Sequence, residues 1–344
     1  MLFQNIENNH FNVPDSLFIR NSVYKSFTKV GTLVKGEDVS PNGANALSIS
    51  RQLSIRKSFS EMIERRSLLL GGKTNYKDQV PTWDMVRNIP SFLPHRYTIY
   101  QTEGLYISDT TGTATHTDSR KAIQTAIQEL LEKNALYLFW YGKKGYKLKL
   151  KNYKNDIPSL YFNLLRSMEF VKLFVNDTFY PLFVVFVALC THQKDIYTGI
   201  GSSFLLTCAI QKAIEEAYVL KWQKEFNYIL NTNYLGKDGS AQVKSDIQLE
   251  YLLEMDALPY YISSDRTYSD GDIRDCFPKW LTNLHIIMLQ NELYPLLKCV
   301  KVFSLDLYNH VPIKQYLKVN QKINVETVKI SKDVLCKIPD CIFV

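Results

Sequence analysis

Acidic and basic side chains recur at helical spacing in three segments of the sequence. The charged residues of these segments are Glu61, Glu64 and Arg65 in the first, Glu129, Glu132 and Lys133 in the second, and Lys212 and Glu216 in the third. Residues three or four apart share one face of an α-helix. Like charges one turn apart destabilise a helix by about 0.2–0.5 kcal/mol per pair, so the paired glutamates gain from a cation that neutralises them.

A hard divalent cation between the carboxylates would remove this repulsion. Mg²⁺ binds oxygen ligands and usually sits between protein carboxylates and substrate phosphates. The interleaved Arg65, Lys133 and Lys212 can hold phosphate oxygens by charge-assisted hydrogen bonds. The pattern therefore predicts a nucleotide site lined by helices, with acids for the metal and bases for the phosphates. Each motif alone is also typical of a solvated helix face with a local salt bridge, and that interpretation stays open.

Motifs of other ligand sites are missing from the sequence. It contains no G-x-x-x-x-G-K-[ST] motif, and Gly199 and Gly201 lack the rest of the dinucleotide-binding fingerprint. The six histidines are scattered and the six cysteines form no C-x-x-C pair, so neither a zinc site nor a disulfide framework is predicted. A formal net charge of +7 is mild, and no signature of a nucleic-acid-binding fold occurs. We therefore expect no nucleic-acid partner.

Apolar periodicity places the charged segments on helices. The pattern predicts three of them, over 46–70, 119–137 and 205–223. Gly71 and Gly72 are expected to end the first helix, and Asp118 or Thr117 to cap the second. We interpret the glycines and serines of 199–203 as a turn that precedes the third helix.

Two further segments are typical of strands. Phe174–Cys190 is largely apolar and predicts a buried strand, and it is too short for the roughly 20 residues that span a bilayer. In 142–154, Lys147, Lys149 and Lys151 alternate with apolar residues, which predicts a strand with one lysine face. That face is either a docking surface for an acidic peptide or partner, or a charged edge that prevents aggregation.

Length and composition favour one compact domain. The chain has 344 residues, 46% of them hydrophobic, and no linker divides it. We expect an α+β fold, with helices packed on mixed β-sheets and a nucleotide cleft between helices. Its parts are predicted to be a β-rich N-terminal segment (1–45), an ATP-binding core (46–318) and a C-terminal tail (319–344). Without a signal-peptide pattern or a membrane span, a cytoplasmic location is expected.

Three stretches resemble the YcaO family of ATP-dependent peptide-modifying enzymes. Ser54–Ser67, SIRKSFSEMIERRS, is similar to the family's S-x-x-x-E-x-x-E-R helix. Asp109–Trp140 resembles its D-S-x-G-x-A segment and the E-x-x-E-R-D helix that follows. Gly199–Trp222 is similar to its glycine turn and A-x-x-R-A-x-x-E-A helix. In order and spacing the resemblance covers about residues 45–310, and it implies the YcaO-like fold.

The resemblance also implies roles by position. It places Mg²⁺ ligands at Glu61, Glu64, Glu129, Glu132 and Glu216. It places ATP contacts at Glu61, Arg65, Glu129, Lys212 and Glu216. The residues expected to be catalytic are Glu64, Glu132, Lys133 and Val344. The chain departs from the family's Ser, Asn, Glu and Gln at Lys57, Thr117, Lys121 and Val219. Lysines replace two family arginines at Lys133 and Lys212, which keeps the charge but loses the bidentate fork.

The implied reaction is ATP-dependent activation of a peptide amide. In azoline formation a substrate Cys, Ser or Thr side chain attacks the preceding carbonyl, and the oxyanion takes the γ-phosphoryl group. Loss of phosphate then leaves a thiazoline or oxazoline. In thioamide formation an external sulfide is the nucleophile. Both depend on positioning and charge neutralisation. The departures from the family pattern motivate a third hypothesis, a degenerate scaffold that binds a partner or leader peptide without hydrolysing ATP.

The same resemblance implies partners and a role for the tail. Azoline-forming members often end in a proline-rich tail that reaches the active site, whereas 337–344 holds only Pro339. The apolar end is expected either to tuck inward and present the Val344 carboxylate as a base, or simply to dock. The substrate would be a ribosomally made precursor peptide, in a bacteriocin- or microcin-type synthetase. A separate ThiF-like or leader-binding protein and a flavin dehydrogenase are implied as partners, and a homodimer is compatible with the sequence.

Overall fold

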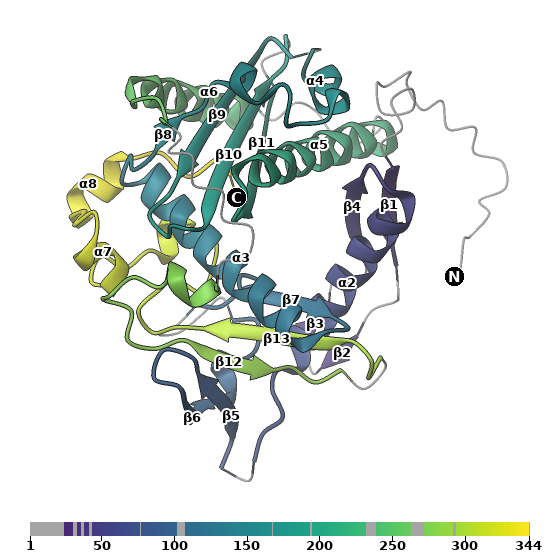
Figure 1. The fold of residues 1–344 in the computed structure, drawn as a ribbon, viewed down its shortest axis with the longest axis vertical. Coiled ribbons are helices and arrows are strands. Elements are labelled where there is room, and N and C mark those ends of the chain that lie inside the picture. The colour runs from purple at the N-terminus through teal and green to yellow at the C-terminus, as the bar shows by residue number, and fades with distance from the viewer. Residues whose placement is uncertain are drawn as a thin grey trace, which may run out of the picture.

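The computed structural model describes most of the chain. The described residues are 24–29, 33–35, 38–40, 43–75, 77–101, 107–166, 168–192, 195–231, 239–262, 272–291 and 294–343. Helices and antiparallel sheets combine in one mixed fold (Figure 1). The predicted α+β class is confirmed.

Two antiparallel sheets form the framework. The larger sheet has the order β6-β5-β12-β13-β7 and the smaller one the order β11-β10-β9-β8. The strands of the larger sheet are β5 (Gln79–Asp84), β6 (Ile89–Pro94), β7 (Thr113–His116), β12 (His285–Met288) and β13 (Lys298–Phe303). Those of the smaller sheet are β8 (Tyr146–Lys147), β9 (Phe170–Asn176), β10 (Phe183–Cys190) and β11 (Ile196–Ser203). Because the chain leaves the larger sheet after β7 and returns to it at β12, the two sheets belong to one domain.

Helix α3 (Ser119–Trp140) lies between the two sheets (Figure 1). It packs on β7 and β13 of the larger sheet and also contacts β9 and β11 of the smaller one. The Asp118 side chain accepts hydrogen bonds from two backbone N–H groups of the first turn, as its predicted role as N-cap requires. Every side chain from Asn134 to Trp140 is buried, so the helix runs beyond the predicted end and carries its aromatic residues into the core.

Helix α2 (Arg51–Leu70) packs on a small sheet of β1 (Tyr24–Thr28) and β4 (Ala44–Ser48). The predicted start at residue 46 is wrong because 44–48 pairs with β1, and Ser50 caps the helix instead. Gly71, with φ +73°, ends the helix as predicted. A second short pair, β2 (Val34–Lys35) and β3 (Asp38–Val39), precedes β4.

The contact between α2 and its small sheet is polar. The Ser54 and Ser58 hydroxyls on the helix meet those of Ser26 and Thr28 on β1, with oxygen–oxygen distances of 2.6–3.1 Å. These hydroxyls join the helix to β1 by hydrogen bonds.

Helix α5 (Leu206–Asn231) lies directly on β11. A Cβ at Gly199 would come within 2.1 Å of the carbonyl oxygen of Ala213, and one at Gly201 within 2.3 Å of that of Ala209. These glycines therefore allow the helix backbone to approach the strand. The predicted turn over 199–203 is wrong, because the segment is part of β11. Helices α4 (Ser159–Leu165) and α6 (Gly239–Glu254) lie in the same half of the molecule (Figure 1).

Two strand predictions also need correction. The predicted buried strand 174–190 is two antiparallel strands, since β9 ends at Asn176 and β10 begins at Phe183. The predicted lysine strand over 142–154 stops after Lys147 and continues as a 3₁₀ turn. The backbone N–H of Lys147 donates to the Pro259 carbonyl, and the Lys147 carbonyl accepts from the Tyr261 N–H. Residues 259–261 therefore lie along the edge of the smaller sheet. The Nζ atoms of Lys147 and Lys149 lie over the ring of Tyr260, 4.4 and 4.0 Å from its centre.

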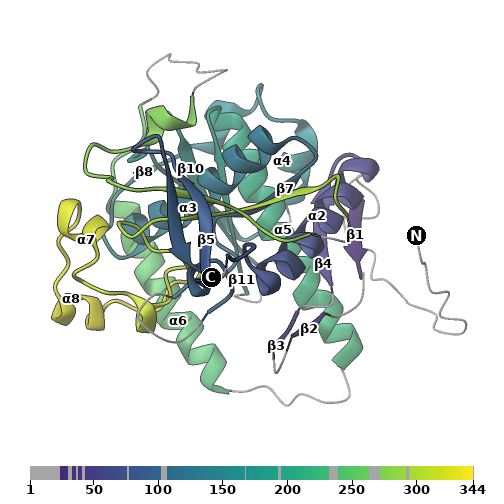
Figure 2. The same ribbon diagram turned by 90° about the horizontal axis from the view of Figure 1, so that it is seen from below.

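The C-terminal tail turns into the core. Helices α7 (Lys322–Glu326) and α8 (Lys332–Lys337) lie across the molecule from α2, β1 and β4 (Figure 2). Beyond them Phe343 is buried, with its ring 5.7 Å from that of Phe186, and the Thr198 hydroxyl donates to the Ile342 carbonyl at 2.8 Å. Val344 lies outside the described residues. The division of the chain at 45 and 318 stays a prediction, and β4 crosses the first boundary.

The hairpin of β5 and β6 forms the outer edge of the larger sheet. Trp83 and Phe92 are 42% and 58% exposed on it. The edge strand β6 contains Pro90 and Pro94, which have no N–H to donate. Within the described residues, no helix is long and apolar enough to cross a membrane.

Candidate active site

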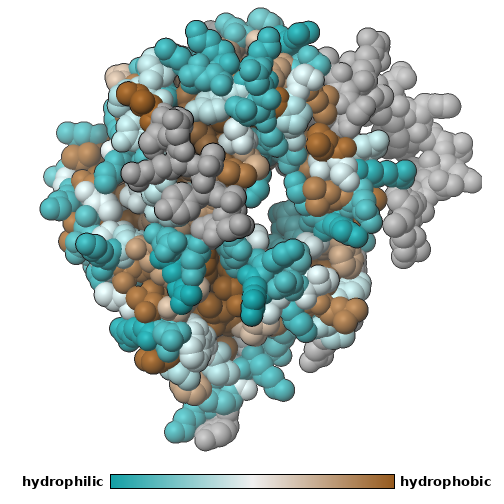
Figure 3. All heavy atoms as spheres, viewed as in Figure 1, coloured by the Kyte–Doolittle hydropathy of each residue, from teal (hydrophilic) through white to brown (hydrophobic). Residues whose placement is uncertain are grey.

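A cavity of about 910 Å³ lies where α2, α3 and the β11–α5 unit meet. In the space-filling view the molecule is hollowed here, with hydrophilic side chains on the rim (Figure 3). The predicted site residues that line the cavity are Glu61, Glu64, Arg65, Glu129, Glu132 and Lys212. The structure thus brings together three segments that lie far apart in the sequence.

The α2 wall contributes two carboxylates in different settings. Glu64 accepts a hydrogen bond from the Thr115 backbone N–H at 2.7 Å. Burial raises its pKa well above the ordinary value, and the nearby charges of Glu129 and Glu61 raise it further. Glu61 forms an ion pair with Arg65 at 2.5 Å, and Arg65 also donates to the Gly43 carbonyl at 3.0 Å. Burial raises the pKa of Glu61, although Arg65 opposes this.

The α3 wall is more deeply enclosed. Glu129 accepts from the Thr113 backbone N–H at 3.1 Å, and burial raises its pKa to about 8. Glu132 pairs with Lys133 at 3.0 Å, and their side chains are only 12% and 13% exposed. Burial alone would lower the pKa of Lys133, but Glu132, Glu216 and Glu129 around it raise the pKa above its ordinary value.

The α5 wall supplies one carboxylate and one lysine. Glu216 accepts from the Ile200 backbone N–H at 2.5 Å, and burial raises its pKa against the opposing charge of Lys133. Lys212 donates to the Ser202 carbonyl at 2.8 Å. Lys133 and Glu216 are not among the residues that line the cavity. They interact with Glu132 from behind, so the structure brings them next to the site rather than into its wall.

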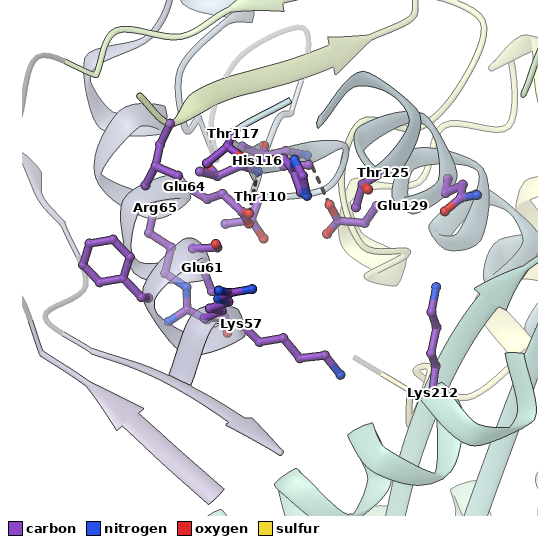
Figure 4. A pocket seen from close by; sticks show the side chains of 18 of the residues that line it. Lys57, Glu61, Glu64, Arg65, Thr110, His116, Thr117, Thr125, Glu129 and Lys212 are labelled. Atoms are coloured by element: carbon purple, nitrogen blue, oxygen red, sulfur yellow. Dashed lines mark hydrogen bonds and ion pairs between the residues drawn. The ribbon is translucent and has the colours of Figure 1, made fainter. Parts of the chain in front are cut away.

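The donor set fits Mg²⁺ together with phosphates. Glu64 and Glu129 are half-buried carboxylates that make no ion pair within the described residues, and they point towards one another across the cavity (Figure 4). Thr113 also lines the cavity, and its buried hydroxyl has no hydrogen-bond partner in the described part. No three acidic, histidine or cysteine side chains of the described residues are close enough to hold a metal by themselves. Mg²⁺ commonly takes only one or two carboxylates and completes its shell with phosphates and water.

Sequence reasoning missed a lysine beneath the site. Lys301 on β13 is fully buried, and its Nζ donates to the carbonyls of Asp109 and Thr111 at 2.6 and 2.7 Å. It thereby fixes the loop that leads to Thr113 and carries the cavity residue Thr110. The available signal was that Lys301, unlike Lys298 at the strand's start, lies between apolar residues of the strand KCVKVF. A lysine at such a buried position is costly unless it is hydrogen-bonded.

The departures from the expected motif fall at different places. Lys57 and Thr117 line the cavity, whereas Lys121 and Val219 do not. The predicted catalytic Val344 lies outside the described residues. In the tail before it, burial raises the pKa of the Cys341 thiol, and the charge of Lys133 opposes this.

The chain resembles known proteins in sequence pattern and in fold. The family model described as YcaO cyclodehydratase, ATP- and Mg²⁺-binding, matches residues 73–280. The matched range starts after α2, so the assignment of Glu61 and Glu64 to the site depends on the geometry and on the motif. No curated protein sequence matches the chain.

Solved structures share the fold at low sequence identity. YcaO from Methanopyrus kandleri, bound with AMPPCP and Mg²⁺, has a TM-score of 0.63 and 14% identity, over 86% of this chain and 88% of that one. A chain of the E. coli microcin synthetase McbBCD complex has a TM-score of 0.67 and 16% identity, over 91% of this chain and 95% of that one. A heterocyclase in complex with substrate and cofactor has a TM-score of 0.58 and 14% identity, over 88% of this chain and 52% of that one.

At these identities the structures show a common fold, and the family match spans more than half of the chain. The carboxylate-lined cavity lies where three separate helices of that fold converge. The chain belongs to the YcaO family of cyclodehydratases, whose cofactors are ATP and Mg²⁺.

Proposed function

We propose that the protein modifies a ribosomally made precursor peptide in an ATP-dependent reaction, activating a backbone amide so that a thiazoline or oxazoline forms. It would act as the cyclodehydratase subunit of a bacteriocin- or microcin-type synthetase. The observation that carries the proposal is the convergence of paired carboxylates from α2 and α3 on one cavity that also holds Lys212. Such a site neutralises charge on a metal-bound polyphosphate.

The residues divide into two roles. Glu61, Glu64, Glu129 and Glu132 would hold Mg²⁺ in pairs, and Arg65 and Lys212 would contact the phosphates. ATP supplies the phosphoryl group that activates the amide. Lys133 and Glu216 would orient Glu132 from behind, because Lys133 pairs with Glu132 and interacts with Glu216. The inward course of the tail to Phe343 supports a role for the Val344 carboxylate as a base.

The proposal includes partners of stated kinds. The substrate is a precursor peptide, and a ThiF-like or leader-binding protein would deliver it. A flavin dehydrogenase would oxidise azolines to azoles. The solved complex of microcin synthetase McbBCD with pro-MccB17 is a related fold with a bound peptide and partner chains, which supports this arrangement. We place the reaction in the cytoplasm, and a homodimer is compatible with it.

Two alternative functions follow from particular observations. The single proline of the tail favours thioamide formation, in which sulfide is the nucleophile. The departures at Lys57 and Thr117, both in the cavity wall, favour a scaffold that does not hydrolyse ATP. Mass spectrometry of the modified peptide distinguishes azoline formation from thioamide formation, since an azoline has lost water whereas a thioamide has exchanged oxygen for sulfur.

Calorimetry with Mg-ATP tests the nucleotide site directly. The wild-type chain should bind Mg-ATP, and Glu64→Gln and Glu132→Gln should each weaken binding or lower ATP turnover at least about 100-fold, as expected for metal ligands. Glu326→Gln is the matched control, because Glu326 is exposed on α7, far from the cavity. Wild-type binding and turnover in both site variants would overturn the proposal. Binding without turnover, even with peptide and partner, would favour the scaffold.

A further inference from the structure

Lys57 reaches across the cavity from α2 to α5. It lies one helical turn before Glu61 and lines the cavity. Its Nζ forms an ion pair with Glu215 on α5 at 2.8 Å. The lysine side chain is 41% exposed, whereas that of Glu215 is 14% exposed. An ion pair with one partner this exposed contributes little to stability, so Lys57 is free to exchange its partner.

Glu215 is held in place by a second contact. Its other carboxylate oxygen accepts a hydrogen bond from the Tyr161 hydroxyl at 2.7 Å. Tyr161 lies on α4 and is only 2% exposed, so it fixes the carboxylate. Glu215 therefore stays on the α5 side when Lys57 moves, and keeps a hydrogen-bond donor of its own.

A second lysine faces Lys57 from the opposite wall. Lys212 and Lys57 point into the same space of the cavity (Figure 4). Lys212 bonds the Ser202 carbonyl and makes no ion pair with any residue in the described part of the chain. Burial lowers the pKa of Lys212, Glu132 opposes this, and the charge of Lys57 lowers it further. Two ammonium groups that share one cavity are a binding site for an anion with several oxygens.

We propose that Lys57 exchanges Glu215 for the polyphosphate of the bound nucleotide, so that Lys57 and Lys212 hold it from two walls. The inference rests on the proposed function and deepens it. Lys57 stands where the family motif has serine, so the contact is a property of this chain rather than of the family pattern. Glu215 acts as the internal anion that occupies Lys57 until the nucleotide arrives.

Two variants distinguish this exchange from a simple structural bridge, because they act in opposite directions. Lys57→Gln should weaken Mg-ATP binding about tenfold by loss of one charge-assisted contact. Glu215→Gln should tighten it about threefold, because Lys57 no longer has a competing partner. Glutamine at position 215 can still accept from the Tyr161 hydroxyl, so the wall keeps its structure. A structural bridge predicts instead that both variants weaken binding and lower the midpoint of thermal unfolding alike.

Nucleotides of different length give a second measurement. The loss of affinity in Lys57→Gln should be present for Mg-ATP and absent for AMP, which has no polyphosphate. This measurement does not depend on whether Glu215→Gln folds. Equal loss for both nucleotides overturns the inference. An unchanged affinity of Lys57→Gln for Mg-ATP also overturns the inference. In that case the proposed function still stands, provided that the wild-type chain binds Mg-ATP. A wild-type chain that does not bind Mg-ATP overturns the proposed function and the inference with it.

Discussion

The α2 wall and the α3–α5 wall carry similar charged motifs in different surroundings. On α2, Glu61 and Arg65 pair at 2.5 Å with side chains 37% and 32% exposed, and one side of the helix meets β1 through hydroxyl contacts. On α3, Glu132 and Lys133 pair at 3.0 Å with side chains 12% and 13% exposed, and the helix continues into the core. The same residue types therefore form a partly exposed ion pair on one wall and an enclosed one on the other. Burial, rather than the motif itself, decides which role the charges take.

The largest expected effect separates the two motif cations. Lys133→Met should lower the free energy of unfolding by about 3–5 kcal/mol, because it leaves Glu132 and its buried acidic neighbours without their cation. Arg65→Gln should cost less than about 1 kcal/mol, because its pair is partly exposed. Chemical denaturation of both variants without nucleotide measures the difference. Equal losses would show that the two walls are energetically alike.

A smaller effect tests how closely each wall is packed. Gly201→Ala should cost about 1–3 kcal/mol, because the new Cβ would lie 2.3 Å from backbone oxygen of α5. Gly43→Ala, beside the α2 wall, should cost less than about 1 kcal/mol, because the only close contact of its Cβ is the side chain of Phe27, which is 57% exposed and can move, while the Thr28 carbonyl oxygen lies at an ordinary 3.5 Å. Thermal unfolding of the two variants gives the comparison. A larger loss for Gly43→Ala than for Gly201→Ala would contradict it.

The smallest effect is a pH dependence on the enclosed side. Burial lowers the pKa of Lys301 to about 8, against the opposing charges of Asp109 and Glu129. The unfolded chain therefore binds more protons than the folded one between about pH 8 and 10, so this lysine's contribution to stability rises with pH. The free energy of unfolding of the wild type minus that of Lys301→Met should therefore rise by about 1 kcal/mol per pH unit over that range.

Denaturation at pH 7.5, 8.5 and 9.5 measures this slope. Comparison with Lys301→Met removes the contributions of the cysteines and tyrosines, which both proteins share. Arg65→Gln is the control on the α2 wall, since a guanidinium stays charged throughout. A difference that stays flat or shrinks with pH would show that Lys301 is not the group that titrates.

The parts of the site set by local spacing could be predicted from the sequence. The three motif helices, the Asp118 cap and the stop at Gly71 follow from residues within a few positions of one another. The buried Met62 and Ile63 between the first pair of glutamates fit the same periodicity. Local patterns of this kind also carry the family resemblance, which is why the fold class could be predicted.

The parts set by distant partners could not be predicted. From the sequence, Gly199 and Gly201 fit either a turn or a strand that a helix backbone approaches closely. Only the position of α5 decides between these two structures. The lysine strand ends after Lys147 because a segment more than 100 residues later occupies its edge. Lys301 resembles any strand lysine until the loop at Asp109 folds over it.

The prolines of β6 limit how other chains can meet this protein. Pro90 and Pro94 remove two of the donors that an added strand would need at the outer edge of the larger sheet. Extension of the sheet into a continuous intermolecular one is therefore disfavoured, and with it a common route to insoluble assemblies. A neighbour that touches the exposed Trp83 and Phe92 must recognise their side chains instead of the backbone, which makes such an encounter selective and reversible.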